Sequence, residues 1–243
     1  MVEPVAPGGA GSPALRVLSW NVHDLLGDPI AVVAVLRAAA PDVVCLQEAP
    51  RLWRTAYKLA TLARSAGLLY VTGGRRSAGT ALLCSMRAVV TGEAAVRLPT
   101  SGRLTRPRGL AHARVGLPGL APLHVVSVHL GLTPEERAGH VAMIRDLVAG
   151  SRAAVVAGDL NEVPGGPSWR ALGDVVTDPA PGAPVTFPVR GPDRRLDAVL
   201  TSPGVVVHEY ASWQPDEQVL RRASDHRPVL AVVSPPGPVG ASG

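Results

Sequence analysis

Residues 153–164 read AAVVAGDLNEVP, an apolar run that passes directly into polar residues. The run Ala153–Ala157 is short and continuous, as is typical of a buried β-strand, and Asp159 and Asn161 follow it. Taken alone, GDLN is also typical of an Asx-turn at a strand end. The same change occurs after three other apolar runs, with Asn21 after RVLSW, Glu48 after DVVCLQ and His129 after HVVSV. This repetition predicts several strands that end in polar, potentially functional residues.

Apolar runs bounded by turn residues predict a strand-rich domain on both sides of this stretch. We expect strands at Leu15–Trp20, Asp42–Leu46, Leu68–Thr72, Thr80–Ser85, Leu110–Val115, His124–Val128, Ala153–Ala157, Leu196–Leu200, Val205–Glu209 and Pro228–Val233. We expect helices at Pro29–Ala40, Leu52–Ser65 and Pro134–Val148. So many strands with so few helices favour an α/β four-layer sandwich, in which two packed mixed β-sheets are flanked by helices.

Helix and domain boundaries follow from local signals. Asp28 precedes the first helix as an N-cap, and Thr133 with Glu136 predicts a capping box before the third. Residues 1–14 and 234–243 are rich in Gly, Pro and Ser, and we expect them to be disordered extensions. The remainder, residues 15–233, shows no internal linker and is predicted to be a single domain.

Polar residues also stand at the beginning of two predicted strands. Asp197 opens LDAVL, and Asp225 with His226 precedes RPVLAVV. If these strands run antiparallel to the four described first, their starts meet the other strands' ends at one rim. Each residue also has a simpler interpretation, since Asp197 is equally a cap or a partner of a surface arginine, and SDH is equally a turn.

Such a rim would have a defined chemistry. Carboxylates such as Glu48 offer hard oxygen ligands, which suit Mg²⁺ or Mn²⁺ better than zinc. Asp197 beside His226 would orient the imidazole, and neutral donors such as Asn161 would hold anionic oxygens. Together these groups indicate attack of water on a phosphoester with a metal offsetting negative charge.

Six segments, in order, carry a resemblance: LSWNV, LQE, VHLG, GDLNEVP, RRLDAVLTS and SDHRPVL. From about Leu18 to Val233 the chain resembles the endonuclease/exonuclease/phosphatase superfamily, which has the DNase I-like fold. The resemblance implies a Mg²⁺-dependent phosphoester hydrolase, with Mn²⁺ as an alternative cation. Within that class a nuclease and a small-molecule or lipid phosphodiesterase remain open, and a non-catalytic phosphate-binding module on the same fold is the alternative.

The resemblance also implies a role for each residue of the rim. It implies a metal site formed by Glu48, Asn21 and Asp225. It assigns Asp159 to the attacking water, Asn161 to the scissile phosphate, and His226, oriented by Asp197, to phosphate contact or acid–base catalysis. It assigns His129 to donation to the phosphate or leaving oxygen. His23 departs from the pattern, because DNA-repair members carry an aspartate there, which weakens the case for a repair nuclease.

Composition and hydropathy exclude some classes of function and of membrane association. The chain has 243 residues, a formal net charge of +5 and 3% aromatic residues, which argues against single-strand recognition by extensive base stacking. No apolar run approaches the roughly 20 residues that span a membrane. The start, MVEPVAPGGAGSPA, lacks the features of a secretory signal, so we predict a cytoplasmic protein of open oligomeric state.

The remaining polar and sulfur-containing residues receive simpler interpretations. Cys45 and Cys84 lie in apolar runs and are predicted to be small buried residues rather than a disulfide or a reactive thiol. Trp169 is expected to pack rather than line a cleft, and His140 to face solvent. Five loop arginines are equally consistent with phosphate binding and with a solvated surface: Arg75, Arg76, Arg103, Arg106 and Arg108.

Overall fold

Strand β1 (Leu15–Asn21) is buried on both of its faces, so the structure has layers on both sides of it. Leu15 and Val17 pack into a core between two β-sheets. Leu18 and Trp20 point the opposite way, into a core covered by helices. This alternation follows from the twofold periodicity of a strand, and because both sets are apolar, β1 is a central strand.

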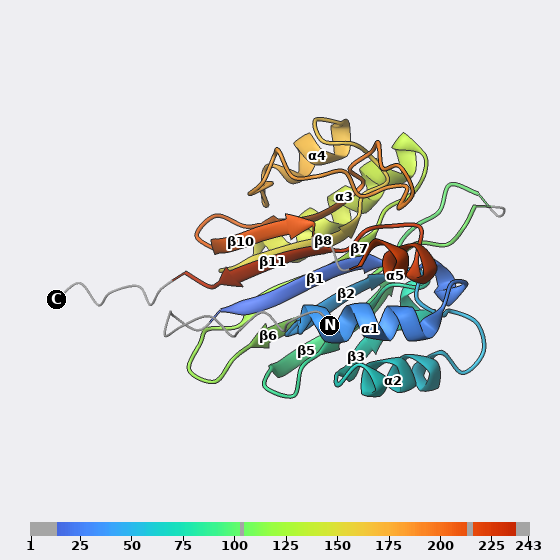
Figure 1. Cartoon of the computed structure of the whole chain (residues 1–243). Coiled ribbons are helices and arrows are strands. Elements are labelled where there is room, and N and C mark those ends of the chain that lie inside the picture. Colours follow the sequence, from blue (N-terminus) through green and yellow to red (C-terminus); the bar gives the residue numbers. More distant parts are fainter. Residues whose placement is uncertain (1–13, 103–104, 213–215, 237–243) are drawn as a thin grey trace.

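The computed structural model describes residues 14–102, 105–212 and 216–236, which form two mixed sheets (Figure 1). The six-stranded sheet has the order β10 (Val206–Ser212), β11 (Val229–Ser234), β1, β2 (Val43–Gln47), β4 (Ala81–Cys84) and β3 (Leu69–Gly73). The five-stranded sheet has the order β5 (Val89–Arg97), β6 (Gly109–Gly116), β7 (Leu123–His129), β8 (Ala154–Asp159) and β9 (Asp197–Thr201). The pairs β1–β2 and β7–β8 are parallel, and the other paired strands are antiparallel.

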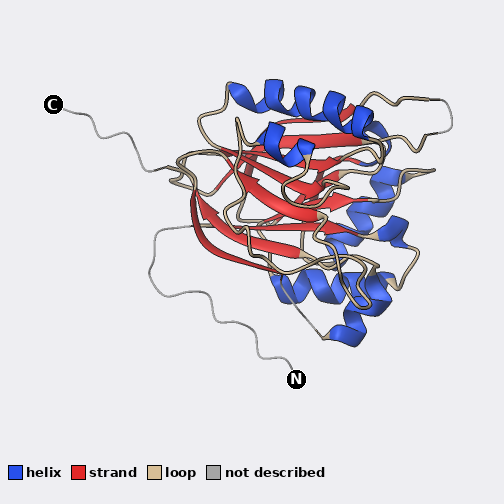
Figure 2. Cartoon of the chain, turned by 90° about the horizontal axis from the view of Figure 1, so that it is seen from above, coloured by secondary structure: helices blue, strands red, loops and turns tan. Residues whose placement is uncertain are grey.

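Helices cover the outer face of each sheet, as the view in Figure 2 shows. Helices α1 (Pro29–Ala39), α2 (Thr55–Ser65) and α5 (Glu217–Ala223) pack on the six-stranded sheet. Helices α3 (Pro134–Ala149) and α4 (Pro167–Leu172) pack on the five-stranded sheet. The predicted four-layer arrangement of helices and two mixed sheets is therefore confirmed.

The helix caps agree with the sequence in part. The Ile30 amide donates to Asp28 Oδ1 at 2.9 Å, and the Glu136 amide donates to Thr133 Oγ1 at 3.3 Å. The second half of the predicted capping box is absent, because the Glu136 carboxylate accepts hydrogen bonds from the amide and hydroxyl of Ser101. Ser101, in a loop distant in sequence, therefore donates to the Glu136 carboxylate in place of the backbone amide of Thr133.

Strand β5, the α-helices α4 and α5, and two short 3-10 helices at His23–Leu25 and Gly74–Ser77 were not predicted from the sequence. Strand β5 is largely exposed or half-buried and its register shifts near Gly92, so it lacks a clear apolar alternation. Helices α4 and α5 are only 6 and 7 residues long, which is too short for a clear helical period. The predicted helix Leu52–Ser65 begins later, at Thr55, because Trp53 and Arg54 have positive φ angles.

The remaining residue predictions have mixed outcomes. Cys45 and Cys84 are buried and unbonded to each other, and Trp169 of α4 packs into the core between the helices and the five-stranded sheet, as predicted. The prediction for His140 was wrong: it is fully buried, and its ring contacts the Gly131 amide and the Pro99 carbonyl. The predicted tail begins too early, because Ser234 closes β11.

Several predictions concern residues that the structure does not describe. The predicted extension 1–14 lies outside the described residues except for Ala14, and residues 237–243 of the predicted tail and Arg103 lie outside them as well. Among the described residues, no helix is both long enough and apolar enough to cross a membrane.

The core between the sheets should dominate stability. Leu82 of β4 is 1% exposed in this core, so L82A removes buried apolar contacts and leaves a cavity. We expect L82A to lower the free energy of unfolding by about 2–5 kcal/mol in urea titrations. The matched control is L69A on the adjacent strand β3, where the side chain is 52% exposed and a change of about 0.5 kcal/mol or less is expected. Equal losses in the two variants would contradict this assignment of the core.

Candidate active site

The strand ends place the predicted residues at one rim. Asn21 ends β1, His129 ends β7 and Asp159 ends β8. Strand β9 runs antiparallel to β8, so its first residue, Asp197, lies directly opposite Asp159. The strand polarity expected from the sequence is therefore confirmed for β9, and it is confirmed for β11 beside β1 as well.

Close backbone packing brings β7 and β8 together just before the rim. A Cβ atom added to Gly158 would lie 1.9 Å from the carbonyl oxygen of Val128, so only glycine fits there. The pairing then sets His129 beside Asp159 in parallel register.

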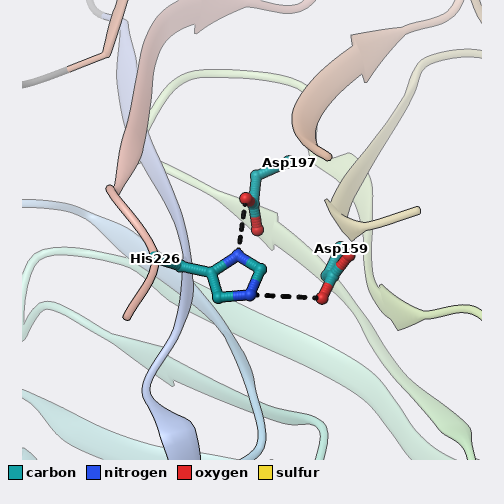
Figure 3. A group of neighbouring side chains, drawn as sticks. All are labelled: Asp159, Asp197 and His226. Atoms are coloured by element: carbon teal, nitrogen blue, oxygen red, sulfur yellow. Dashed lines mark hydrogen bonds and ion pairs between the residues drawn. The ribbon is translucent and has the colours of Figure 1, made fainter. Parts of the chain in front are cut away.

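The carboxylate of Asp159 has contacts with several groups of the site, and Figure 3 shows it beside the ring of His226. It is 2% exposed, and its Oδ1 atom accepts a hydrogen bond from the Asn161 amide at 2.9 Å. Its Oδ2 atom accepts one from Asn21 Nδ2 at 3.1 Å. The Nε2 atoms of His129 and His226 lie 3.4 and 3.9 Å from the same Oδ2. Nitrogen atoms from three separate chain segments thus converge on one buried oxygen.

His226 is held from behind by Asp197. Its Nδ1 atom lies 2.8 Å from Asp197 Oδ2, and the Asp197 side chain is fully buried. The Phe187 ring packs against the imidazole with a centroid distance of 4.6 Å, and Trp20 Nε1 donates to the His226 carbonyl at 3.0 Å. The imidazole therefore has a defined orientation, with Nε2 facing Asp159.

The two histidines have opposite electrostatic surroundings. Burial alone would lower the pKa of His226, but Asp197, Asp159 and Asp225 outweigh it and raise that pKa to about 10. Burial and the nearby Arg108 cation lower the pKa of His129 well below its ordinary value. His226 is therefore protonated and His129 neutral near pH 7.

Burial, followed by repulsion from Asp197, raises the pKa of Asp159 to about 6. Protonated His226, the Asn161 amide and the Asn21 amide oppose this rise. At neutral pH, Asp159 is ionised but is more basic than an exposed aspartate, which suits a group that accepts a proton.

Glu48 lies beside this cluster, immediately after β2, in a left-handed backbone conformation with φ of 49°. Its carbonyl accepts a hydrogen bond from the Asp24 amide at 2.7 Å. Gly79 has φ of +102°, and a Cβ atom there would lie 3.2 Å from the Ala49 carbonyl oxygen. The Ala49 amide in turn donates to the Gly79 carbonyl at 2.7 Å, so this loop holds the chain around Glu48.

The side chains of two predicted residues make neither a hydrogen bond nor an ion pair with Asp159. The Asp225 side chain is 41% exposed, and its Oδ1 atom is 3.8 Å from His23 Nδ1. Asn161 contributes its backbone amide to Asp159, while its side-chain Nδ2 donates to the Leu130 carbonyl. The metal role of Asp225 and the phosphate role of the Asn161 side chain stay predictions from the resemblance.

The structure adds residues that the sequence reasoning did not place in the site. Ser224 Oγ donates to the Asn21 carbonyl at 2.6 Å and accepts from the His226 amide, which joins the SDH segment to β1. Arg108 is buried against His129, with Nη1 3.4 Å from Nδ1. Ser224 had a visible signal, because it opens the SDH segment, whereas the burial of Arg108 depends on the packing of distant strands.

The donor set fits a divalent cation. Glu48 Oε2 is buried and accepts no hydrogen bond, although Arg106 Nη2 lies 3.0 Å away. Asp159 and Asp197 each offer a further carboxylate oxygen, and these oxygens lie within 4.8 Å of each other. Carboxylate oxygens dominate this set, which favours a hard cation such as Mg²⁺.

The Asp197–His226 pair generates a pH-dependent prediction. A histidine with a raised pKa adds stability that is fully present below its unfolded value of 6.5 and is lost as pH rises through about 10. We expect D197N to lower the pKa of His226, measured by NMR titration in EDTA. The Tm advantage of the unmodified protein over D197N should therefore shrink from neutral pH to about pH 10. A Tm difference that stays constant over this range would contradict the assignment.

Comparison with known proteins identifies the family to which the chain is similar. The chain matches the model of the endonuclease/exonuclease/phosphatase family over residues 18–226. None of the curated proteins compared with the chain matches it.

Solved structures share the fold. An endonuclease/exonuclease/phosphatase from Bacteroides vulgatus is 18% identical with a TM-score of 0.75, covering 92% of this chain and 99% of its own. One from Beutenbergia cavernae is 25% identical with a TM-score of 0.69, covering 92% and 72%. A Bacteroides thetaiotaomicron mannosyl-6-phosphatase is 17% identical with a TM-score of 0.73, covering 90% and 99%. Because the family model spans most of the chain and these structures share its fold, the chain belongs to the endonuclease/exonuclease/phosphatase family.

Proposed function

We propose that this protein is a metal-dependent phosphoester hydrolase that cleaves a phosphodiester, with the chain from Leu15 through the end of β11 as a single catalytic domain. Members of its family are generally phosphoester hydrolases. The observation that carries the proposal is the convergence of Asn21, His129 and His226 on the buried Asp159 carboxylate, with Asp197 behind His226. A binding module would not need a base, an oriented acid and neutral donors in one place.

In the proposed reaction the oxygen of water forms a bond to phosphorus and the ester P–O bond breaks. Asp159 Oδ2 accepts a proton from the attacking water, because burial makes this carboxylate more basic than usual. Protonated His226, held by Asp197, donates the Nε2 proton to the leaving oxygen. Asn21 Nδ2, His129 Nε2 and the side chain of Asn161 stabilise the charged phosphoryl oxygens.

Glu48, with Asn21 and Asp225, would hold the divalent cation, Mg²⁺ or Mn²⁺. When bound, the cation offsets the negative charge that develops on the phosphoryl group. Arg106 contacts both Glu48 and Asp24, so a cationic group of the chain itself lies beside the predicted metal ligand.

Two substrate classes have structural support. Arg106 contacts Glu48 and Asp24, and Arg51 lies beside Asp24, so two arginines near the site suit a polyanion such as a nucleic acid. A groove of about 560 Å³ runs between α1 and α2, with Asp24 in its wall. Its lining is largely apolar and includes Ile30 and Tyr57, which suits a phosphodiester with an apolar group, such as a lipid. Cytoplasmic location stays a prediction from the sequence.

The D159N variant tests the catalytic assignment. Replacing the base with a neutral isostere should reduce kcat by about 1,000-fold or more, measured with bis-nitrophenyl phosphate and Mg²⁺. The change keeps the shape of the side chain, so Tm should shift by only a few degrees. The matched control is D174N, because Asp174 is 62% exposed and pairs with Arg145 on the surface. Full activity of D159N, or no Mg²⁺-stimulated activity of the unmodified protein on nitrophenyl, nucleic acid and phospholipid substrates, would refute the proposal.

Salt dependence separates the two substrate classes. We expect E48Q to bind DNA without cleaving it, so its affinity can be titrated with salt. For a nuclease, log Kd should rise linearly with log salt, with a slope of about 0.9 per neutralised phosphate of duplex DNA. Weak binding with no such slope, together with cleavage of a lipid phosphodiester by the unmodified protein, would favour the second class.

A further inference from the structure

Arg108 is a cation buried in the wall of the site. It directly precedes β6, whose first residue, Gly109, pairs with His129 of β7. The residue is only 5% exposed. Within the described part of the chain, its guanidinium has one hydrogen-bond contact, from Nη1 to His129 Nδ1 at 3.4 Å, and no ion pair. The charges of Asp159 and Glu48 favour the guanidinium, but burying a cation that has no direct carboxylate partner is still costly, so this arrangement calls for a functional explanation.

The direction of this contact determines where the proton of His129 lies. A guanidinium has only donors, so the Nδ1 atom that faces it must be the acceptor. In a neutral imidazole the proton is then on Nε2. Nε2 lies 3.4 Å from Asp159 Oδ2, which is an acceptor. Both neighbours of the ring therefore favour the same Nε2–H tautomer.

The charges around His129 support a neutral ring. Four groups that can carry positive charge lie near the ring. They disfavour a positive charge on His129 itself, and they are Arg108 before β6, His226 before β11, and the loop residues Arg106 and Arg51. Asp159 of β8 is the carboxylate in contact with the ring. The contrast with His226 is direct, because Nδ1 of His226 faces the carboxylate of Asp197, whereas Nδ1 of His129 faces a guanidinium.

We propose that Arg108 is a positioning residue that holds His129 as the neutral Nε2–H tautomer, so that His129 is a fixed hydrogen-bond donor. The catalytic part of this inference rests on the proposed function, whereas the tautomer does not. Arg108 acts through His129, because its contact is with the ring nitrogen remote from Asp159.

Tautomers of histidine can be read directly from long-range ¹H–¹⁵N NMR spectra. The protein would be labelled with ¹⁵N-histidine, kept free of metal, and His129 assigned by its loss in H129Q. We expect the Nε2–H tautomer in the unmodified protein and in R108K, which keeps a cationic donor. In R108M the side chain keeps similar bulk but donates nothing, so we expect His129 to shift to Nδ1–H or to a mixture. R114M on the same strand is the matched control, because Arg114 is exposed, and its His129 should be unchanged.

Kinetics provide the second readout. In R108M the His129 proton is no longer fixed on Nε2, so kcat should fall by about 10- to 100-fold with a smaller change in KM. R108K should recover most of the loss. An Nδ1–H tautomer in the unmodified protein, or an unchanged tautomer in a folded R108M, would overturn the proposal even if activity fell.

If R108M does not fold, R108Q replaces it. The glutamine amide can donate to Nδ1 or accept from Nδ1–H, so we expect His129 to lose its single Nε2–H form. Retention of that form in R108Q would overturn the proposal. Absence of phosphoesterase activity in the unmodified protein would refute the proposed function and leave the tautomer result standing.

Discussion

The buried carboxylate of Asp159 is the constraint on which the rest of the site depends. A carboxylate that is 2% exposed must find donors within the protein, because an unpaired buried charge is strongly destabilising. Its donors and close neighbours come from Asn21 on β1, His129 on β7 and His226 before β11. Since β1 and β11 belong to one sheet and β7 and β8 to the other, the site exists only when the two sheets are packed together.

The same carboxylate is approached by two imidazoles that differ in what lies behind them. Asp197 behind His226 favours the protonated ring, and Arg108 behind His129 favours the neutral one. Environments that push the pKa values of two titratable groups apart are typical of acid–base catalysis. The division between a charged and a neutral imidazole is therefore set by residues that need not touch the substrate.

Much of the fold could be predicted because its signals are local. Apolar runs predicted ten of the eleven strands found in the described part of the chain, and the Asp28 cap predicted the start of α1. Three of the failures share a physical cause, since each involves a partner that is distant in the sequence. Glu136 bonds to Ser101 instead of closing its capping box, and His140 is buried because Pro99 and Gly131 satisfy its ring. Strand β5 is held by its pairing to β6 and has no strong pattern of its own.

The candidate site also has features that local sequence signals predict and features that depend on contacts between distant residues. The sequence alone indicated which residues stand at strand ends, because the change from an apolar run to Asp159 or His129 is a local pattern, and six ordered motifs indicated the family. It could not show which atoms meet, because contacts such as Asn21 to Asp159 span 138 residues and depend on strand register and sheet packing. For the same reason Arg108, which reads as an ordinary loop arginine in the sequence, becomes a buried neighbour of His129 when β6 pairs with β7.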